Sequence, residues 1–271
     1  MRPVFQILPD SINTSNKDLI CEISESGFAY FLQDYDTKFI QGLSVYHFDK
    51  INGIDSLTNT LQKIFDNDST ISGPFRKTTI CYSFKESILI PESIHQFEAA
   101  NESLTVVYGE MPASIVRSEN IPGTKIHNIY RISEEVHQAI TKYFPTAAVI
   151  HQYTALSHTE NEISAMTAIF YPNKIITKLI KEGALQIIQS YNYSCPEDVV
   201  YYMLNICHQF SVEVVTLNLG GMIEKDSAMY DEIHKYFKQI NFLALGADVA
   251  EGIKEFPAHY FGHLFLLSSC E

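Results

Sequence analysis

The sequence predicts a mixed α/β protein in which two halves repeat one order of elements. Each half begins with three extended segments separated by short polar turns, as in an antiparallel meander. In both halves a segment with helical spacing of its apolar residues and a further strand follow. No run of residues recurs, so the repetition is one of architecture. We therefore expect two mixed sheets rather than one doubly wound sheet.

Three strands open the first half, and a helix and a fourth strand follow them. Their predicted bounds are Leu19–Ile23, Phe28–Gln33 and Phe39–Phe48 for the meander, Ile54–Phe65 for the helix and Thr78–Phe84 for the last strand. Residues 1–17 are polar and rich in turn formers, so we expect a tail there and an ordered core that begins near Asp18. For Pro91–Thr124 the pattern predicts only a helix followed by an extended loop.

The second half repeats this order after a crossing region. The crossing region is expected to contain a helix at Ile132–Tyr143, a strand at Ala147–His151 and the segment Tyr153–Asn161. The elements expected after it are strands at Ile163–Tyr171, Ile175–Ile180 and Ala184–Tyr193, a helix from Pro196 to Cys207 capped by Cys195 or Ser194, a strand at Glu213–Leu219 ending in the turn Gly220–Gly221, a helix at Ser227–Phe237, a strand at Phe242–Leu245 and a closing helix at His259–Ser268. We accordingly expect one lobe over residues 18–150, which includes an insertion, and a second over 151–271.

Composition excludes several classes of function. Of the 271 residues, 46% are hydrophobic and 19% charged, which is typical of a globular protein and excludes disorder as the main state. A net charge of -13 and four arginines leave no basic stripe for nucleic acid or for acidic lipid head groups. Five cysteines without a C-x-x-C spacing indicate reduced core thiols. Because no segment matches a signal peptide or a membrane span, we expect a cytoplasmic protein without membrane insertion.

The double βββαβα order resembles the actin-like ATPase superfamily, in which two ribonuclease-H-like lobes clasp ATP between them. The meander Cys21 to Phe48, the segment Leu89 to Pro91 and the turn Leu217 to Gly221 look most like a bacterial family of uncharacterised proteins with this fold. The resemblance covers nearly the whole chain from Asp18 and rests mainly on element order. It implies a two-lobed protein with mixed sheets.

The resemblance also shows where a nucleotide would be held and what is missing there. In the superfamily the first hairpin of each lobe carries an acid and small residues, because backbone N–H groups cradle phosphate while the carboxylate holds the metal. The first hairpin here keeps Ser26 and Gly27 but lacks the Asp-x-Gly pattern, and Glu25 could replace the acid only in a shifted turn. The second hairpin, Phe170 to Lys174, has neither a carboxylate nor a glycine.

Only the turn on the adenosine side keeps the superfamily's pattern. Gly220, Gly221 and Met222 resemble its Gly-Gly segment, which lies against the base and ribose. If a nucleotide binds, these three residues would contact it together with Ser26 and Gly27. A tight turn with close packing explains the glycines as well, and we favour that interpretation.

Other chemistries find less support in the sequence. A two-metal nuclease would use Glu22 on the first strand, but the strand Thr78–Phe84 supplies no second acid. Zinc could be held by His259 and His263 on one helical face, although further ligands at a recognisable spacing are missing. Buried thiols are the default for Cys81 and for Cys207 beside His208. Surface or hydrogen-bonding roles are expected for His151 and His158, and packing roles for Tyr201–Tyr202 and Tyr260–Phe261, which could otherwise form a partner surface.

We therefore predict a degenerate, non-catalytic protein with an actin-like ATPase fold that acts as a scaffold and binds a protein partner. No catalytic residue, metal site or bound cofactor is expected. The alternative is a protein that binds ATP with Mg²⁺, another nucleotide or a small anion between its lobes, or hydrolyses ATP there. This alternative needs a metal-binding carboxylate that the sequence does not identify.

Overall fold

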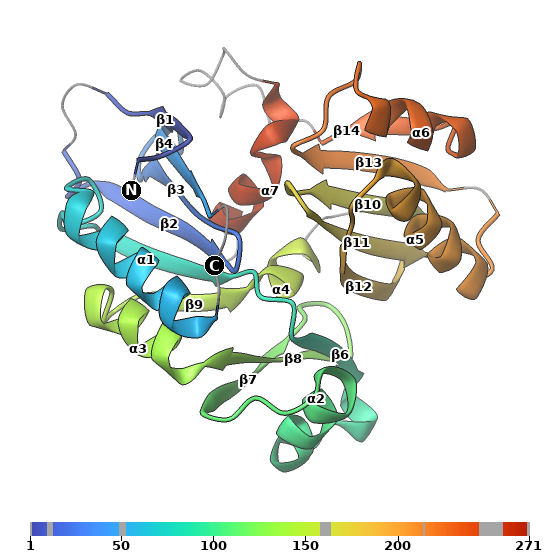
Figure 1. The fold of residues 1–271 in the computed structure, drawn as a ribbon, viewed down its shortest axis with the longest axis horizontal. Coiled ribbons are helices and arrows are strands. Elements are labelled where there is room, and N and C mark those ends of the chain that lie inside the picture. Colours follow the sequence, from blue (N-terminus) through green and yellow to red (C-terminus); the bar gives the residue numbers. More distant parts are fainter. Residues whose placement is uncertain are drawn as a thin grey trace. The chain divides into compact units, whose positions relative to one another are not determined.

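The computed structural model describes residues 2–9, 13–48, 53–157, 164–213, 215–243 and 257–269. These residues form two compact units (Figure 1), unit 1 from those up to residue 155 and unit 2 from those after it. Each unit has a mixed sheet of its own, and unit 1 carries a further small sheet.

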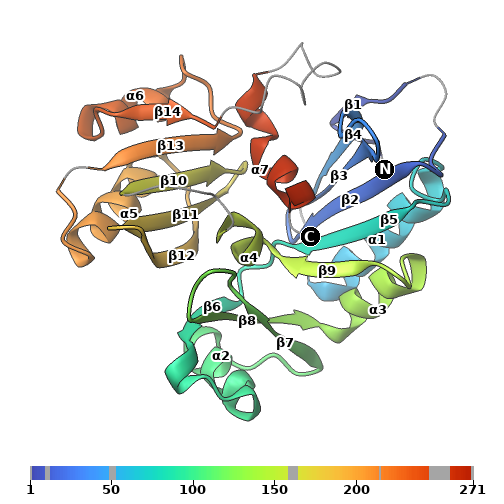
Figure 2. The ribbon, with the colours of Figure 1, turned by 180° about the vertical axis from the view of Figure 1, so that it is seen from behind.

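The main sheet of unit 1 has six strands in the order β1-β4-β3-β2-β5-β9. Their bounds are β1 Phe5–Ile7, β2 Lys17–Ser24, β3 Gly27–Asp34, β4 Ile40–His47, β5 Lys77–Tyr82 and β9 Ala148–His151. The strands β1 to β4 pair antiparallel, whereas β2, β5 and β9 run parallel to one another. Figure 2 shows β9 beside β5 at one side of this sheet.

Helices α1 (Ile54–Asn67) and α3 (Glu134–Tyr143) pack on one face of the main sheet (Figure 1). Strand residues alternate between the two faces of a sheet, so Leu19, Cys21 and Ile23 all point into this core. The helices contribute residues at helical spacing, among them Leu61 and Ile140. Apolar periodicity thus accounts for both helices.

Between β5 and α3, unit 1 carries the expected insertion, and its helix is present, but its small sheet is not predicted from the sequence. It contains β6 (Ser87–Pro91), two 3₁₀ turns (Glu92–Ile94 and Phe97–Ala99), α2 (Ala100–Tyr108), β7 (Ser114–Asn120) and β8 (Ile126–Ser133). The three strands form an antiparallel sheet in the order β6-β8-β7. The expected extended loop is therefore wrong. Polar residues at buried strand positions, such as Asn128 and Arg131 in β8, hide the strand pattern.

The sheet of unit 2 has the order β12-β11-β10-β13-β14. Its strands are β10 Ala165–Phe170, β11 Lys174–Lys181, β12 Ala184–Asn192, β13 Thr216–Gly221 and β14 Ile240–Phe242, and its helices are α5 Pro196–Gln209 and α6 Ala228–Tyr236. The first three strands are antiparallel neighbours, and β10, β13 and β14 are parallel. This order and these directions match β4-β3-β2-β5-β9 of unit 1, which confirms the duplicated architecture.

Several boundaries differ from the sequence-based expectation. Ordered structure does not begin near Asp18, because Phe5–Ile7 pair with β4. The helix α3 begins at Glu134, since Ile132 and Ser133 end β8. Strand β14 lies earlier than Phe242–Leu245, and residues 244–245 are outside the described part.

The end of the chain also differs from the expected single helix. Residues His259–Ser268 are divided among a 3₁₀ turn (Ala258–Tyr260), α7 (Gly262–Phe265) and a second 3₁₀ turn (Leu266–Ser269). Gly262, a weak helix former, is the first residue of α7, and Phe261 separates it from the first turn. A short helix α4 (Gln152–Ser157) follows β9 directly.

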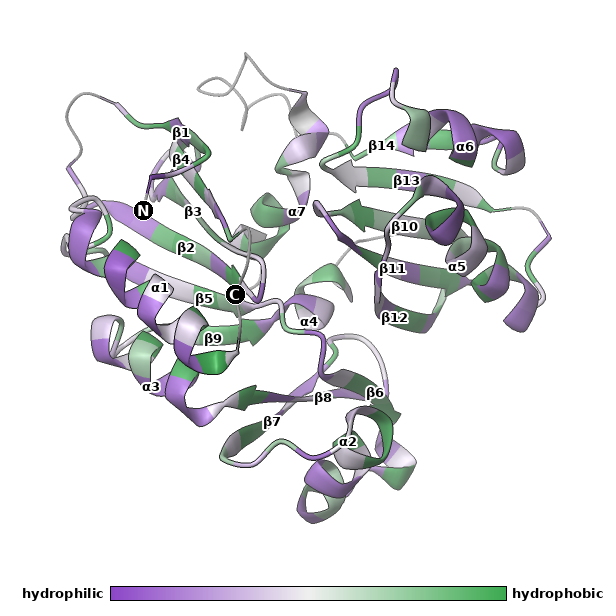
Figure 3. Cartoon of the chain, in the orientation of Figure 1, coloured by the Kyte–Doolittle hydropathy of each residue, from purple (hydrophilic) through white to green (hydrophobic). Residues whose placement is uncertain are grey.

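Hydropathy follows this architecture. In Figure 3 the strands β2 and β10 include green, hydrophobic stretches, whereas α6 shows purple, hydrophilic bands. Within the described residues, no helix combines the length and the apolar character that crossing a membrane requires.

Candidate functional site

The first hairpin of unit 1, where phosphate would be expected, is a two-residue loop closed by its own contacts. Glu25 and Ser26 alone join β2 to β3. The N–H of Ser26 donates to Ser24 Oγ at 3.3 Å, and the Ser26 carbonyl accepts from Phe48 N–H at 2.9 Å. A Cβ on Gly27 would lie 2.7 Å from the Tyr46 carbonyl oxygen, so this glycine is required by the close approach of β4.

The corresponding hairpin of unit 2 is closed in the same way. The N–H of Tyr171 donates to the Lys174 carbonyl at 2.8 Å, and Tyr193 N–H donates to the Asn173 carbonyl at 3.1 Å. The Tyr193 hydroxyl donates to the Tyr171 carbonyl at 2.6 Å. Pro172 has no N–H, so the loop offers few of the outward donors on which a phosphate cradle depends.

The glycine pair of unit 2 belongs to strand β13 rather than to a turn after it. Gly220 and Gly221 pair in register with Ile169 and Phe170 of β10. Gly221 has a φ of 78°, and a Cβ there would lie 2.2 Å from the Phe170 carbonyl oxygen. A Cβ on Gly220 would lie 2.7 Å from Leu243 Cδ1. Close packing within unit 2 therefore accounts for both glycines.

The five predicted nucleotide contacts are divided between the units. Ser26 and Gly27 lie in unit 1, whereas Gly220, Gly221 and Met222 lie in unit 2. Of the last three, Met222 is exposed, and its N–H donates to the Phe170 carbonyl at 2.8 Å. A nucleotide shared by these five residues stays a prediction.

A second group of residues lies at the carboxyl ends of the parallel strands of unit 1, where open α/β sheets bind their ligands. Glu22 of β2 is in register with Cys81 of β5, and both are buried. The Cys81 thiol donates to Gln152 Oε1 at 2.9 Å. Gln152 is fully buried, and no described residue accepts a hydrogen bond from its Nε2.

Gln152 is the residue of this group that sequence reasoning missed. It follows β9 directly and opens α4. The available signal was its position, because the residue after a short buried parallel strand lies at the ligand-binding edge of a sheet.

His151 is wholly buried and structural, so a surface role for it is wrong. Its Nε2–H donates to the Phe84 carbonyl at 3.1 Å, and its Nδ1 accepts from Tyr153 N–H at 3.1 Å. Its own N–H donates to the carboxylate of Glu119, which the Tyr130 hydroxyl also reaches at 2.5 Å. Burial and this carboxylate raise the pKa of Tyr130. These bonds tie β7 and β8 to the end of β9. His158 is outside the described residues.

The remaining candidates take structural roles. His259 and His263 do not share one helix, and His259 Nε2 donates to the Ile223 carbonyl at 2.7 Å. Burial raises the pKa values of the Cys21 and Cys207 thiols, which suits inert core cysteines. Within the described residues no group of three or more histidine, cysteine or carboxylate side chains is placed to hold a metal ion.

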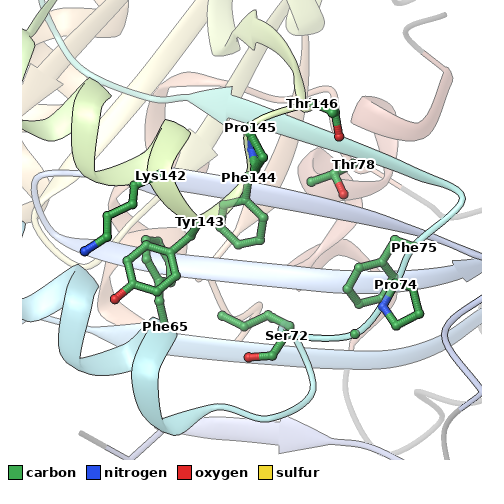
Figure 4. A pocket seen from close by; sticks show the side chains of 12 residues that line it. Phe65, Ser72, Pro74, Phe75, Thr78, Lys142, Tyr143, Phe144, Pro145 and Thr146 are labelled. Atoms are coloured by element: carbon green, nitrogen blue, oxygen red, sulfur yellow. The ribbon is translucent and has the colours of Figure 1, made fainter.

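Unit 1 also contains a pocket of about 450 Å³ that sequence reasoning did not find (Figure 4). It lies where α1 and α3 end and where β5 and β9 begin, at the opposite end of the parallel strands from Gln152. Aromatic and proline side chains line it together with threonine, serine and lysine, and more of its lining surface is polar than apolar. The lining residues are Phe65, Ile71, Ser72, Gly73, Pro74, Phe75, Thr78, Lys142, Tyr143, Phe144, Pro145 and Thr146.

The aromatic side chains that line the pocket contact one another. Phe65 is buried and contacts the rings of Tyr143 at 4.9 Å and Phe144 at 5.3 Å between ring centroids. The Tyr143 hydroxyl donates to Asp66. These contacts hold the aromatic rings of the pocket in place.

Comparison with protein families identifies one match. The model of a family described as "Protein of unknown function (DUF3822)" matches residues 9–240, which is most of the chain. No curated protein matches the sequence significantly.

Solved structures with the same fold are more numerous. A Bacteroides thetaiotaomicron protein with an actin-like ATPase fold and unknown function has a TM-score of 0.79 at 18% identity, covering 97% of this chain and 100% of its own. PilM in the PilM–PilN type IV pilus biogenesis complex gives 0.62 at 10% identity, covering 94% and 98%. The ethanolamine utilization protein EutJ from Carboxydothermus hydrogenoformans gives 0.51 at 6%, covering 97% and 92%. These likenesses show the fold, which confirms the actin-like ATPase class.

Proposed function

The chain belongs to the family described as "Protein of unknown function (DUF3822)". We propose that it is a non-hydrolysing protein of actin-like ATPase fold that binds a protein partner. The observation that carries the proposal is the closure of both phosphate hairpins. Ser26 N–H is directed to Ser24 Oγ, and Pro172 removes a donor from the other loop. The second loop carries no carboxylate, and in the first loop the Glu25 carboxylate lies outside an Asp-x-Gly pattern and accepts a hydrogen bond from the Lys85 N–H at 3.3 Å.

A fold-level likeness supports partner binding. PilM has this fold and is found in a complex with PilN. Fold alone does not assign function, so the likeness only makes partner binding a reasonable use of the scaffold. The net charge of -13 favours a basic partner, because opposite charges accelerate encounter.

The pocket of unit 1 provides an anchoring site for such a partner. Its aromatic rings and the polar groups beside them suit a single side chain that has an apolar stem and a polar end, and one such anchor is how the energetic centre of many interfaces is built. Thr146 and Ser72 are exposed at its rim, so larger side chains at these positions would block entry without disturbing the core.

Capture from native lysate tests this proposal. Thr146→Arg should fill the pocket mouth and abolish capture of the partner found with the wild-type chain. Asn59→Arg, on an exposed position of α1 outside the pocket lining, adds the same charge and should leave capture unchanged. Equal capture by both variants, with wild-type melting temperatures, would remove the pocket from the proposal.

A second candidate function is nucleotide or small-anion binding, and the Nε2 donor of Gln152 favours it. A buried donor without a described acceptor at the carboxyl edge of parallel strands fits a ligand oxygen. A ligand present at about a hundred times its dissociation constant adds about 2.7 kcal/mol of stability. Melting with Mg-ATP, Mg-ADP and inorganic phosphate therefore decides between the candidates, with Gln152→Leu as the variant that should lose any shift.

A further inference from the structure

The insertion of unit 1 covers its small sheet with one layer of helical structure. This layer, residues 92–110, contains the two 3₁₀ turns, helix α2 and the two residues that follow it. Three pairs of side chains join it to β8 in the same order along both segments. They are His95 with His127, whose ring centroids are 4.0 Å apart, Leu104 with Ile129, and Thr105 with Arg131 at 3.2 Å. The layer therefore lies along β8, and its opposite side is an outer face.

Large apolar side chains are exposed in this layer. Val106 is 87% exposed and Ile94 69%, and Phe97 and Val107 are exposed as well. Val106 comes two residues after the buried Leu104, which places it about 200° around the helix from the inner side. Adjacent exposed valines do not help α2 to form, because β-branched residues have low helix propensity. The stability of unit 1 therefore does not explain these side chains.

Acidic side chains alternate with the apolar ones. Four exposed glutamates lie in the same layer, namely Glu92, Glu98, Glu102 and Glu110. Among the described residues none of the four forms an ion pair, and residues 86–116 contain no lysine or arginine. Exposed apolar groups rimmed by polar residues mark interaction surfaces. The outer face thus offers apolar anchors within a negative potential.

We propose that the outer face of residues 92–110 binds a basic amphipathic segment of a partner protein, in which lysine or arginine alternates with apolar residues. Charge complementarity selects this occupant. The glutamates attract the basic residues, while the exposed valines, Ile94 and Phe97 bury the apolar ones. This inference rests on the proposed function in that it gives the chemistry of a protein partner. Its surface is separate from the pocket at the ends of α1 and α3.

The same charges disfavour the other occupants that an apolar surface can have. Two copies of the chain that met through this face would set carboxylates against carboxylates, and acidic lipid head groups would be repelled in the same way. A basic segment is the occupant that gains from both the apolar and the acidic side chains. Its affinity should fall as salt is added, because salt screens opposite charges at a surface.

Fluorescence anisotropy of a labelled synthetic peptide tests the proposal on the full chain. The peptide is a helix former of about 18 residues, with leucine along one face and lysine elsewhere, and its counterpart has glutamate in place of every lysine. The basic peptide should bind and the acidic one should not. Val106→Ser combined with Val107→Ser should weaken binding about tenfold or more, because two apolar anchors are lost. Serine and valine have similar helix propensities, so this variant should keep the wild-type melting temperature.

Val4→Ser is the matched control, since Val4 is 62% exposed in the same unit but lies outside the layer. It should bind the basic peptide as wild type does. Glu102→Gln should weaken binding at low salt. Glu135→Gln, which removes the same charge from an exposed position of α3, should leave binding unchanged.

Thr146→Arg separates this surface from the pocket, because it should leave peptide binding unchanged. No binding of the basic peptide, equal binding of both peptides, or undiminished binding by the double valine variant would overturn the proposal. So would self-association of wild type that the double valine variant lacks, since a second copy would then occupy the face. Failure of the peptide to bind would leave the pocket untouched, because partner capture with Thr146→Arg tests that site by itself.

Discussion

The two units repeat one backbone plan and differ in what is added to it. Phe48 N–H donates to the Ser26 carbonyl in unit 1, and Tyr193 N–H donates to the Asn173 carbonyl at the same place in unit 2. Unit 1 adds a strand over the edge of β4 and a small sheet after β5, whereas unit 2 has neither among its described residues. Backbone geometry is thus held in common, while edges and insertions distinguish the units.

The ends of β5 and β13 form equivalent backbone hydrogen bonds next to different residues. Ser83 N–H donates to the Ile23 carbonyl, and Met222 N–H donates to the Phe170 carbonyl, both at 2.8 Å. The preceding residue is Tyr82 in unit 1 but Gly221 in unit 2. The same ladder therefore tolerates a large side chain in one unit and no side chain in the other. The conserved feature is the hydrogen bond, and the glycine is a local requirement.

The largest effect is expected at the insertion that only unit 1 has. Arg131 is buried and bonds Glu86 Oε2 at 2.5 Å, Thr105 Oγ1 at 3.2 Å and the Gly109 carbonyl. Arg131→Met should lower the free energy of unfolding of unit 1 by about 3 to 5 kcal/mol, because it leaves the Glu86 charge without its partner.

Chemical denaturation measures this loss, and Arg76→Met is its control. Arg76 bonds Asp18 at 2.5 Å but is about one third exposed, so its removal should cost about 1 kcal/mol or less. Equal losses for the two variants would show that Arg131 does not hold the insertion in place.

Gly221→Ala should cost about 3 kcal/mol in unit 2, from a left-handed backbone and a clash with Phe170 together. Gly183 has a similar φ of 75° with open space around its Cβ position, so Gly183→Ala should cost only about 1 kcal/mol. Thermal unfolding of the two variants measures their losses of stability. A Gly221→Ala variant no less stable than Gly183→Ala would contradict the packing interpretation.

Gly220→Ala should cost about 1 kcal/mol, because a Cβ there meets the movable ends of Leu243 and Ile169 rather than backbone. Partner capture should be unchanged, since the pair of glycines serves packing. Loss of capture at an unchanged melting temperature would instead make Gly220 part of a binding surface.

The smallest effect is a pH dependence in unit 1. Burial, and then the neighbouring Arg117, lower the pKa of His137, whose ring lies 2.8 Å from the Tyr82 hydroxyl. As pH falls from about 7.5 to about 5.5, the unfolded chain takes up a proton at this histidine more readily than the folded chain. The free energy of unfolding should therefore fall with pH, and it should fall less in His137→Gln. Identical pH dependence in both proteins would exclude His137 as a source.

Sequence reasoning could predict the strand meanders and the main helices because their apolar residues follow periods of two and of 3.6. It could not predict β6 to β8, where Asn128 and Arg131 are buried and satisfied by partners distant in sequence. The same limit applies to the site. The sequence alone shows that the first hairpin lacks the Asp-x-Gly pattern. The position of the Gln152 side-chain amide and the pocket near Phe75 depend on contacts between separate elements.

The most direct test of the account follows the backbone amides of both hairpins by NMR while Mg-ATP is added. Amides in the segments 24–27 and 171–174 should keep their chemical shifts, because the N–H groups of Ser26 and Tyr171 already donate within their own loops and Pro172 has no N–H. Saturable shifts in either hairpin, and above all in both at one dissociation constant, would contradict the claim that this protein keeps the fold of an ATPase without its phosphate-binding loops.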